Sequence, residues 1–455
     1  MTTSEKRSPV HEIVNALWRA LHDLGSDAKL ADIERWGFSI HMALSAPGRE
    51  YHNHDHVVAL TASGDALEVI AALYHDSVYL QVDQDLPHSM RTELGQVLSH
   101  EPQVGQQPPT PGWKILPAAA GIAGDTLAVF GRKIGDLVTP MTGLNEIASA
   151  LVANIQLQHT LTREQRIAIA ACIEQTIPFR VDPVGPLHER LVLLGFEGKL
   201  LDETMRRAVR LGNRDVENFA ENDPAQFLDN TWKLLPESNP ALHAPLVYTV
   251  KDYRIALQKM ETFLSKLPAE RVFHHYQDEP KHEIYARHVA RATGNLELAG
   301  RYLRAKLYAI AVIEAIAEVS GGDVPIDYFM GASKQFLARV DLRRIEQFLP
   351  KLSPAGDLDN HLFGLLAEGR TSESSFDTGP SPIATFLYAA CGEAAIMSGL
   401  DKARTYWGGG FDGNTFLQAL PAKAVAAVAR AAGNIVDTRR DRLFALAERL
   451  EHSPS

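Results

Sequence analysis

Histidine and aspartate side chains gather in two short segments of this 455-residue chain, and both residue types bind divalent cations. His52 and His56 stand four residues apart, a spacing at which a helix presents both imidazoles on nearly one face. His75 and Asp76 follow at the end of an apolar run. A carboxylate buried without a partner is costly, and a divalent cation replaces the hydration that it loses. The two segments together therefore predict a metal site.

The residues around these segments predict the helices that would position the site. Residues 10–24 and 29–44 carry apolar side chains at helical spacing, and the Ser-Ala-Pro-Gly break at 45–48 comes just before the first histidine. Residues 57–73 are again apolar at helical spacing, so we expect one buried helix there. His75 and Asp76 would stand at the end of that helix.

The order of these residues resembles the HD superfamily of metal-dependent phosphohydrolases. The signature of that superfamily is a His, an adjacent His-Asp pair and a distant Asp, all supplied by helices. Within it, the segment Tyr51-His52-Asn53-x-x-His56 is similar to the Tyr-His-Asn-x-x-His motif of the cyclic-nucleotide phosphodiesterases. The resemblance covers roughly the first half of the chain. It implies a helical fold and metal-assisted phosphoester chemistry.

The resemblance also implies a role for each matching residue. His56, His75 and Asp76 match the metal ligands, and Asp76 would bridge the ions if two are bound. His52 matches the histidine that protonates the leaving oxygen. The best candidate for the distant Asp is Asp215, which lies on a helical pattern with apolar neighbours and would otherwise be a helix-capping acid. The implied cofactor is one or two divalent ions, either Mg, Mn, Zn or Fe.

One position departs from the phosphodiesterase pattern. Those enzymes carry another His three residues after the His-Asp pair, and this chain has Tyr79 at that place. The resemblance is therefore weakest at the position of a second metal ion and at the waters around it. The resemblance therefore implies phosphoester chemistry without naming a substrate.

The reaction that we expect is hydrolysis of a phosphoester, with a nucleotide or cyclic nucleotide as substrate. A bound divalent cation lowers the pKa of its water toward neutrality and polarises the phosphoryl oxygen. Asp76 would be a catalytic ligand of that cation. His52, whose side chain titrates near neutral pH, would donate a proton to the leaving oxygen as the general acid.

Two other classes of protein are compatible with the same residues. A di-iron oxygenase of the HD type needs further histidines before the last Asp, and the chain offers His88, His100 and His159. A non-catalytic helical scaffold or nucleotide sensor would retain the metal site. Iron content with oxygen-dependent turnover would select the first class, and tight ligand binding without turnover would select the second.

Several arginines lie close to the predicted ligands in the sequence. Arg49 precedes the first histidine and could hold a carboxylate or phosphate, or could simply lie exposed in its loop. Four more lie beside Asp215 on what approximates one helix face. They could clamp substrate phosphates, or pair with Glu203 and Glu217 on a solvated face. These four are Arg206, Arg207, Arg210 and Arg214.

The composition is that of a globular protein, with 45% hydrophobic and 22% charged residues. The net charge of -11 weighs against duplex nucleic acid, because phosphate backbones are held by basic surfaces, and favours a small phosphorylated substrate. Two distant cysteines, Cys172 and Cys391, suggest buried thiols. No apolar run reaches the about 18 residues that span a membrane, and no signal peptide is evident. We therefore expect no membrane association and a cytoplasmic location.

Helical periodicity runs through most of the chain and predicts an all-α protein. Residues 1–238 would form an HD-domain-like helical bundle, and 239–455 a second helical domain that serves a homo-oligomer or a protein partner. The Pro-rich segment 236–240 suggests the boundary. Residues 101–143 are rich in Pro and Gly and predict a loop-rich insert, either a lid or a surface flap. A brief alternation at 78–82 suggests an extended segment.

Overall fold

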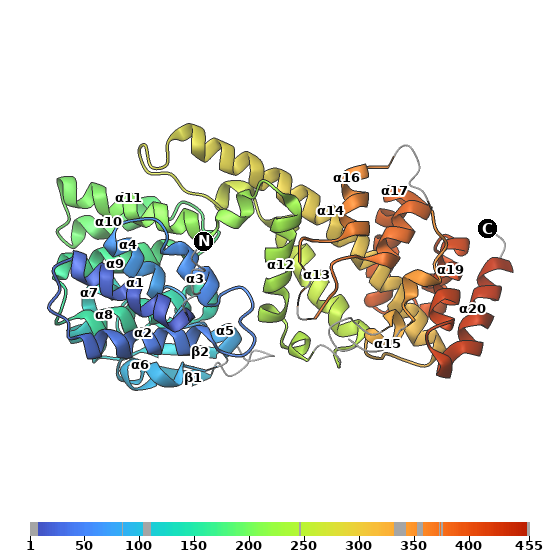
Figure 1. Cartoon of the computed structure of the whole chain (residues 1–455), viewed down its shortest axis with the longest axis horizontal. Coiled ribbons are helices and arrows are strands. Elements are labelled where there is room, and N and C mark those ends of the chain that lie inside the picture. Colours follow the sequence, from blue (N-terminus) through green and yellow to red (C-terminus); the bar gives the residue numbers. More distant parts are fainter. Residues whose placement is uncertain are drawn as a thin grey trace, which may run out of the picture. The chain divides into compact units, whose positions relative to one another are not determined.

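The structure is a computed structural model that describes residues 8–83, 85–102, 111–244, 247–331, 343–352, 358–372, 374 and 376–452. Its chain forms two compact units, whose elements are labelled in Figure 1. Unit 1 comprises Met1–Ala220 and Pro268–Thr293, and unit 2 comprises Glu221–Leu267 and Gly294–Ser455. The predicted boundary at 238/239 lies instead within unit 2, where the Pro-rich segment joins α12 (Pro224–Ser238) to the 3-10 helix η4 (Pro240–His243).

The fold is predominantly helical, as predicted. The elements of unit 1 are α1 (Pro9–Asp23), α2 (Leu30–Leu44), α3 (His54–Leu60), α4 (Ala66–Tyr74), α5 (Leu80–Asp83), η1 (His88–Met90), α6 (Arg91–Val97), β1 (Leu98–Pro102), β2 (Pro111–Ile115), α7 (Ala119–Val129), β3 (Leu137–Val138), η2 (Pro140–Thr142), α8 (Leu144–Leu157), α9 (Arg163–Gln175), α10 (Val184–Leu193), α11 (Gly198–Asp215), η3 (Glu217–Ala220), η5 (Ala269–Arg271) and the first part of α14 (His282–Ser320).

Helix α4 lies in the core of unit 1 and carries the predicted His-Asp pair at its C-terminal end. It is buried on nearly every side, from Leu67 and Glu68 through Tyr74, and contacts α1, α8, α9 and α11. A helix that is apolar all round must be surrounded by other elements. Residues 167–175 of α9 are buried in the same way. His75 and Asp76, which directly follow α4, therefore lie in the interior of unit 1.

The single helix predicted over residues 57–73 is two helices, α3 and α4, so that prediction was wrong. The chain turns at Gly64, whose positive φ of 102° favours glycine. Asp65 then caps α4: its carboxylate accepts hydrogen bonds from the backbone N–H groups of Leu67 and Glu68, while the Glu68 carboxylate accepts one from the Asp65 N–H. This capping box begins a new helix within what appeared to be one apolar run.

Residues 98–138 contain a small sheet that the sequence did not predict. Its strands are antiparallel in the order β1-β2-β3, with Leu98 opposite Ile115 and Trp113 opposite Val138. Trp113 and Ile115 are buried and Lys114 between them is exposed, an alternation too short to recognise in the sequence. Helix α7 also lies in this stretch, so 101–143 is not simply loop. Residues 103–110 of the predicted lid lie outside the described residues, and the lid itself stays a prediction.

The run predicted to be extended at 78–82 is not a strand: Val78 and Tyr79 are irregular, and α5 begins at Leu80. Its backbone is anchored by side chains of α8. The Leu80 N–H donates to Asn145 Oδ1 at 3.0 Å, and the Val78 N–H donates to Ser149 Oγ at 3.1 Å. Tertiary contacts thus decide the conformation of a segment whose alternation suggested a strand.

Unit 2 is built from helices around the second part of α14. Tyr302, Tyr308 and Ile313 on that helix are fully buried. The remaining elements of unit 2 are α12, η4, α13 (Val250–Lys266), α15 (Asp327–Met330), η7 (Ile345–Gln347), α16 (Asn360–Glu368), α17 (Pro382–Trp407), α18 (Gly413–Gln418), α19 (Ala422–Gly433), η8 (Asp437–Arg439) and α20 (Arg440–His452).

Within the described part of the chain, α17 is the one helix long and apolar enough, by composition, to cross a membrane. Its backbone leaves the helical conformation at Gly392, with φ of 76° and ψ of 169°, so it is not one continuous rod. Ten of its residues are buried against the rest of unit 2, Phe386, Leu387 and Tyr388 among them. One helix of this kind is weak evidence for a membrane span.

Candidate metal centre

Helix α3 places His56 at the centre, and Asn53 determines where that helix begins. The Asn53 side chain accepts hydrogen bonds from the backbone N–H groups of Asp55 (2.9 Å) and His56 (3.3 Å), which makes it the N-cap. His52 therefore precedes the helix and does not share a helical face with His56, contrary to the prediction. The two imidazole rings are nevertheless neighbours, with centroids 5.8 Å apart.

His75 is the C-cap of α4, and a backbone carbonyl fixes its orientation. Its Nδ1 lies 2.8 Å from the carbonyl oxygen of Ala72, which can only accept, so Nδ1 carries the proton and donates. Its Nε2 is thereby turned toward the centre. A carbonyl behind one ring nitrogen is the usual way in which proteins orient a histidine that binds a metal through the other.

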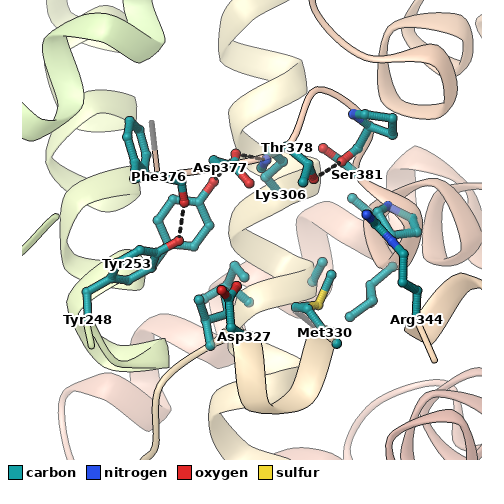
Figure 2. A pocket seen from close by; sticks show the side chains of 18 residues that line it. Tyr248, Tyr253, Lys306, Asp327, Met330, Arg344, Phe376, Asp377, Thr378 and Ser381 are labelled. Atoms are coloured by element: carbon teal, nitrogen blue, oxygen red, sulfur yellow. Dashed lines mark hydrogen bonds and ion pairs between the residues drawn. The ribbon is translucent and has the colours of Figure 1, made fainter. Parts of the chain in front are cut away.

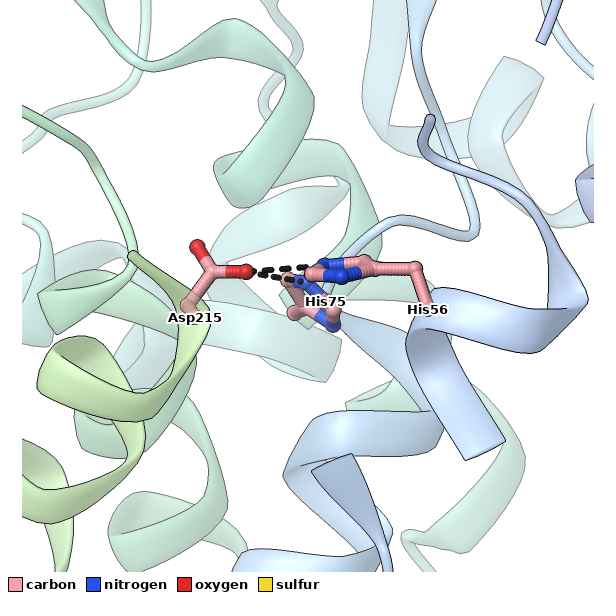
Figure 3. A group of neighbouring side chains, drawn as sticks. All are labelled: His56, His75 and Asp215. Atoms are coloured by element: carbon pink, nitrogen blue, oxygen red, sulfur yellow. Dashed lines mark hydrogen bonds and ion pairs between the residues drawn. The ribbon is translucent and has the colours of Figure 1, made fainter. Parts of the chain in front are cut away.

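Asp215 is the last residue of α11, and its side chain lies beside those of His56 and His75 (Figure 3). Its Oδ1 lies 3.0 Å from His56 Nε2 and 3.2 Å from His75 Nε2. One ligand atom from each of these three residues lies within 4.8 Å of the others, an arrangement that could hold a metal ion. The structure therefore brings together His56, His75 and Asp215, which are separated by up to 159 positions in the sequence.

The surroundings of Asp76 show whether these residues fit a cation. Its Oδ2 lies 3.0 Å from His75 Nε2 and 3.7 Å from His56 Nε2, at the same side of the group. That oxygen is buried, and it lacks a partner in hydrogen-bond geometry among the described residues. A buried carboxylate oxygen without a hydrogen bond is costly, and a cation would satisfy it. The four predicted ligands thus fit a divalent ion in type and position.

The charges at the centre favour a cation between the two carboxylates. Burial lowers the pKa of His75, but Asp76 and Asp215 outweigh burial and raise it well above its usual value. Burial raises the pKa of each aspartate, but the histidines outweigh burial, so that the pKa of Asp76 falls below its usual range and that of Asp215 falls to about 2. Both carboxylates are therefore charged at neutral pH and stabilise positive charge at this position.

Arg49 holds a carboxylate at the site, which is one of the two roles that the sequence allowed for it. Its side chain is 0% exposed, and it donates to both carboxylate oxygens of Asp83, at 2.9 and 2.6 Å. Its Nη1 donates to the backbone carbonyls of Asp76 (2.6 Å) and His52 (3.4 Å). The guanidinium also lies 5.6 Å from the ring centroid of Tyr79. Arg49 is thus buried rather than exposed in its loop, and it holds together the backbones of two site residues.

Tyr79 lies beside His52, with ring centroids 4.6 Å apart. Tyr51 also lies beside this imidazole, with ring centroids 4.9 Å apart. His52 therefore contacts two aromatic rings next to the candidate ligand group, and its charge, when protonated, acts on Asp76.

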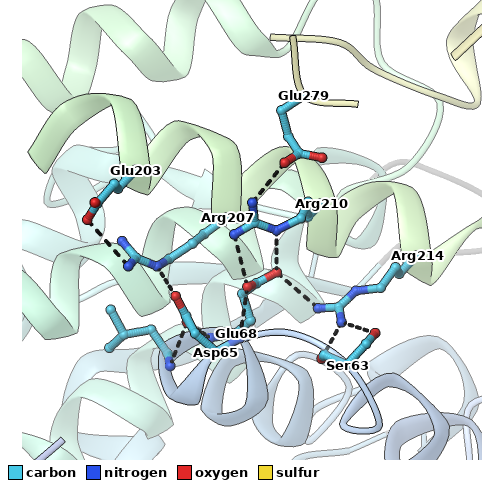
Figure 4. Close-up of polar contacts among 9 residues, drawn as sticks. Ser63, Asp65, Glu68, Glu203, Arg207, Arg210, Arg214 and Glu279 are labelled. Atoms are coloured by element: carbon cyan, nitrogen blue, oxygen red, sulfur yellow. Dashed lines mark hydrogen bonds and ion pairs between the residues drawn. The ribbon is translucent and has the colours of Figure 1, made fainter. Parts of the chain in front are cut away.

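The arginine-rich face of α11 is engaged with carboxylates (Figure 4). Arg210 and Arg214 both donate to Glu68, at 3.1 to 3.2 Å, and Arg207 pairs with Asp65. Of the two predicted partners, Glu203 lies 3.6 Å from Arg207, while the pairing with Glu217 is replaced by contacts to α4. The face therefore joins α11 to the start of α4, the helix that carries His75.

Glu146, in the first turn of α8, is an acidic group near the centre that no sequence pattern singles out. Burial, together with the charges of Asp76 and Asp215, raises its pKa to about 7, although Arg180 and the local backbone act in the opposite direction. Its spacing from the other site residues follows no pattern, so only the fold identifies it.

The histidines required by an oxygenase lie away from the ligand group. His100 is on β1, with its ring 5.3 Å from that of Trp113, and His88 is in η1. His159 follows α8 and is exposed. Within the described ranges, the one group of three or more metal-binding side chains is that of His56, His75 and Asp215.

Comparison with known proteins adds no neighbour from which a role could be transferred. No protein-family model matches the chain, and neither a curated protein nor a solved structure matches it. The function must therefore be inferred from the centre itself.

Proposed function

We propose that the protein hydrolyses a phosphoester at a divalent cation held by His56, His75, Asp76 and Asp215. The observation that carries the proposal is the convergence of these side chains, from α3, the end of α4 and the end of α11, on one point. A nucleotide or cyclic nucleotide is the substrate class that we favour. The HD-type assignment of the fold rests on the motif Tyr51-His52-Asn53-x-x-His56 and belongs to the same proposal.

A bound divalent cation would supply a water of lowered pKa and polarise the phosphoryl oxygen. The protein would do the rest through its own side chains. The two carboxylates hold their charge at neutral pH, and the Ala72 carbonyl keeps His75 in the tautomer that offers Nε2. His52 would give a proton to the leaving oxygen, from a position fixed by Tyr51, Tyr79 and the Arg49 contact to its own carbonyl.

The test combines metal content with turnover on purified protein. Elemental analysis would accompany a panel of cyclic mononucleotides, cyclic dinucleotides, nucleotides and short single strands. Asp76→Ala should lose both metal and turnover, which separates the site from contaminating enzymes. Full metal content in wild type without turnover of any panel member would favour the non-catalytic sensor, and iron with oxygen-dependent turnover would favour the oxygenase.

The division of labour between the histidines has its own test. His52→Ala should lower turnover by about 100-fold to 10,000-fold, the usual contribution of a general acid, while metal content is unchanged. His54→Ala is the matched control, because His54 lies in the same segment but pairs with Asp55 outside the ligand group. Loss of metal from His52→Ala would show that His52 is a ligand instead.

A further inference from the structure

Unit 2 contains a cavity that is independent of the metal centre (Figure 2). Its empty space, including the solvent at its mouth, measures about 650 Å³. Much of its wall is apolar, formed by Ile310, Ile326, Met330, Phe376 and Ile383. A concave apolar wall with a few polar groups is typical of a site for a small organic molecule.

Most polar groups of the wall already have partners within the protein. Lys306 Nζ donates to Asp377 Oδ2 at 2.8 Å, and Tyr253 donates to the same oxygen at 2.6 Å. The Tyr248 hydroxyl donates to the carbonyl of Phe376. Lys306 and Asp377 therefore neutralise each other and leave little attraction for a charged ligand.

Arg344 differs from these residues. Its Nε pairs with Glu346, whose side chain is 38% exposed, so water screens this ion pair more than it screens the buried Lys306–Asp377 pair; its Nη1 is buried and lacks a hydrogen-bond acceptor among the described residues. A buried N–H of a charged group without an acceptor is costly, so such a group in a folded protein calls for a partner. The planar guanidinium matches a carboxylate better than any neutral acceptor.

The positions of the charged groups orient such a ligand. Figure 2 shows Arg344 on the side of the cavity away from Tyr248, with Asp327 nearer to Tyr248 and Met330 between the two charged residues. An acidic group would be attracted by Arg344, through the buried N–H that lacks an acceptor among the described residues. The apolar part of the same molecule would then lie against Met330 and Ile310.

We propose that this cavity binds a small amphipathic carboxylate, whose carboxyl group pairs with Arg344 and whose apolar chain contacts the wall. The inference does not depend on the function of the metal centre. It assigns to unit 2 a ligand site of its own, in place of a purely structural role.

The test uses the full chain and two probes of the same chain length, hexanoate with a charged head group and hexan-1-ol with a neutral one. Ligand-observed NMR titration should give a Kd for hexanoate at least tenfold lower than that for hexan-1-ol. Arg344→Gln should abolish this difference, since it removes the charge and leaves a shorter polar side chain. Arg343→Gln, at an exposed neighbour that does not line the cavity, should preserve it. Equal binding of the two probes to wild type would overturn the proposal.

A second variant locates the site without altering Arg344. Ala309 lines the cavity on α14, so Ala309→Phe should fill it and weaken both probes by at least tenfold. Binding that survives Ala309→Phe would place the probes elsewhere and overturn the assignment. An equal loss in Arg343→Gln and Arg344→Gln would do so too, because it would indicate a general charge effect.

Discussion

Glu68 joins α4 to α11, and its removal should loosen the proposed metal centre without altering any of the proposed ligands. Its side chain is 1% exposed. It accepts hydrogen bonds from Arg210 Nε and Nη2, from Arg214 Nη2 and from the Asp65 N–H, all at 3.1 to 3.2 Å. His75 follows one of the two helices, and Asp215 ends the other. The perturbation that we consider is Glu68→Gln, which preserves size and removes the charge.

The expected cost follows from the burial of this pair. Removing one partner of a buried ion pair costs about 3 to 5 kcal/mol, because the remaining charge is left uncompensated. Arg210 is 37% exposed and retains Glu279, at 2.8 Å, so part of its charge stays compensated. We therefore expect a value near the lower end, about 3 kcal/mol. The control is Glu203→Gln, whose partly exposed carboxylate should contribute at most about 1 kcal/mol.

Hydrogen exchange followed by mass spectrometry suits a chain of two units, because a single unfolding midpoint is not well defined there. A loss of about 3 kcal/mol corresponds to roughly 100-fold faster exchange in peptides of α4 and α11. Metal affinity should fall as well, since the ends of the two helices are no longer held in register. Equal exchange in Glu68→Gln and Glu203→Gln would refute the view that Glu68 joins the helices.

Three further predictions concern other parts of the structure. Arg49→Lys should destabilise unit 1 by about 2 kcal/mol, since lysine cannot reproduce the paired contact with Asp83; unchanged hydrogen exchange in peptides of unit 1 would contradict this. Gly399→Ala should cost about 1 to 3 kcal/mol, measured as faster hydrogen exchange in peptides of α14 and α17, because its Cβ would clash with a ring carbon of buried Tyr308; slower exchange there would show that the ring can move. Burial, and secondarily a nearby arginine, lower the pKa of His274 to about 4, so the unfolded chain takes up its proton first on acidification. Stability should then fall by up to about 3 kcal/mol between pH 6.5 and 4, and His274→Gln should remove that part of the pH dependence.

Chemistry and resemblance together selected the candidate ligands from the sequence. His75 and Asp76 end an apolar helix, where buried ionisable groups need partners, and Asp215 was sought because the signature of the HD superfamily ends in a distant Asp. The expectation that His52 shares a helical face with His56 was wrong. The spacing of four residues suggested one helical turn, but Asn53 caps the helix after His52. Capping residues were visible in the sequence, so this error was avoidable.

Other features could not have been predicted, because they depend on contacts between distant residues. Arg49 is polar and stands in a loop, where exposure is the ordinary expectation. Its burial follows from Asp83, a residue 34 positions away that no local pattern connects with it. The partners of the α11 arginines were likewise expected within the same helix, since i to i+4 pairing is the local rule. The strands are too short for their alternation to stand out from the surrounding Pro and Gly.

The positions of these contacts explain how three separate helix ends can be held at one point. Each end needs a restraint that local helix propensity does not supply. Asn53 fixes the start of α3, and the Asp65 and Glu68 capping box fixes the start of α4. Because the same two carboxylates also receive the arginines of α11, the residues that begin α4 determine where Asp215 lies. Neutralising either carboxylate would therefore disturb both α4 and α11. For this reason we expect Glu68→Gln to lower metal affinity more than the loss of any single helix cap would.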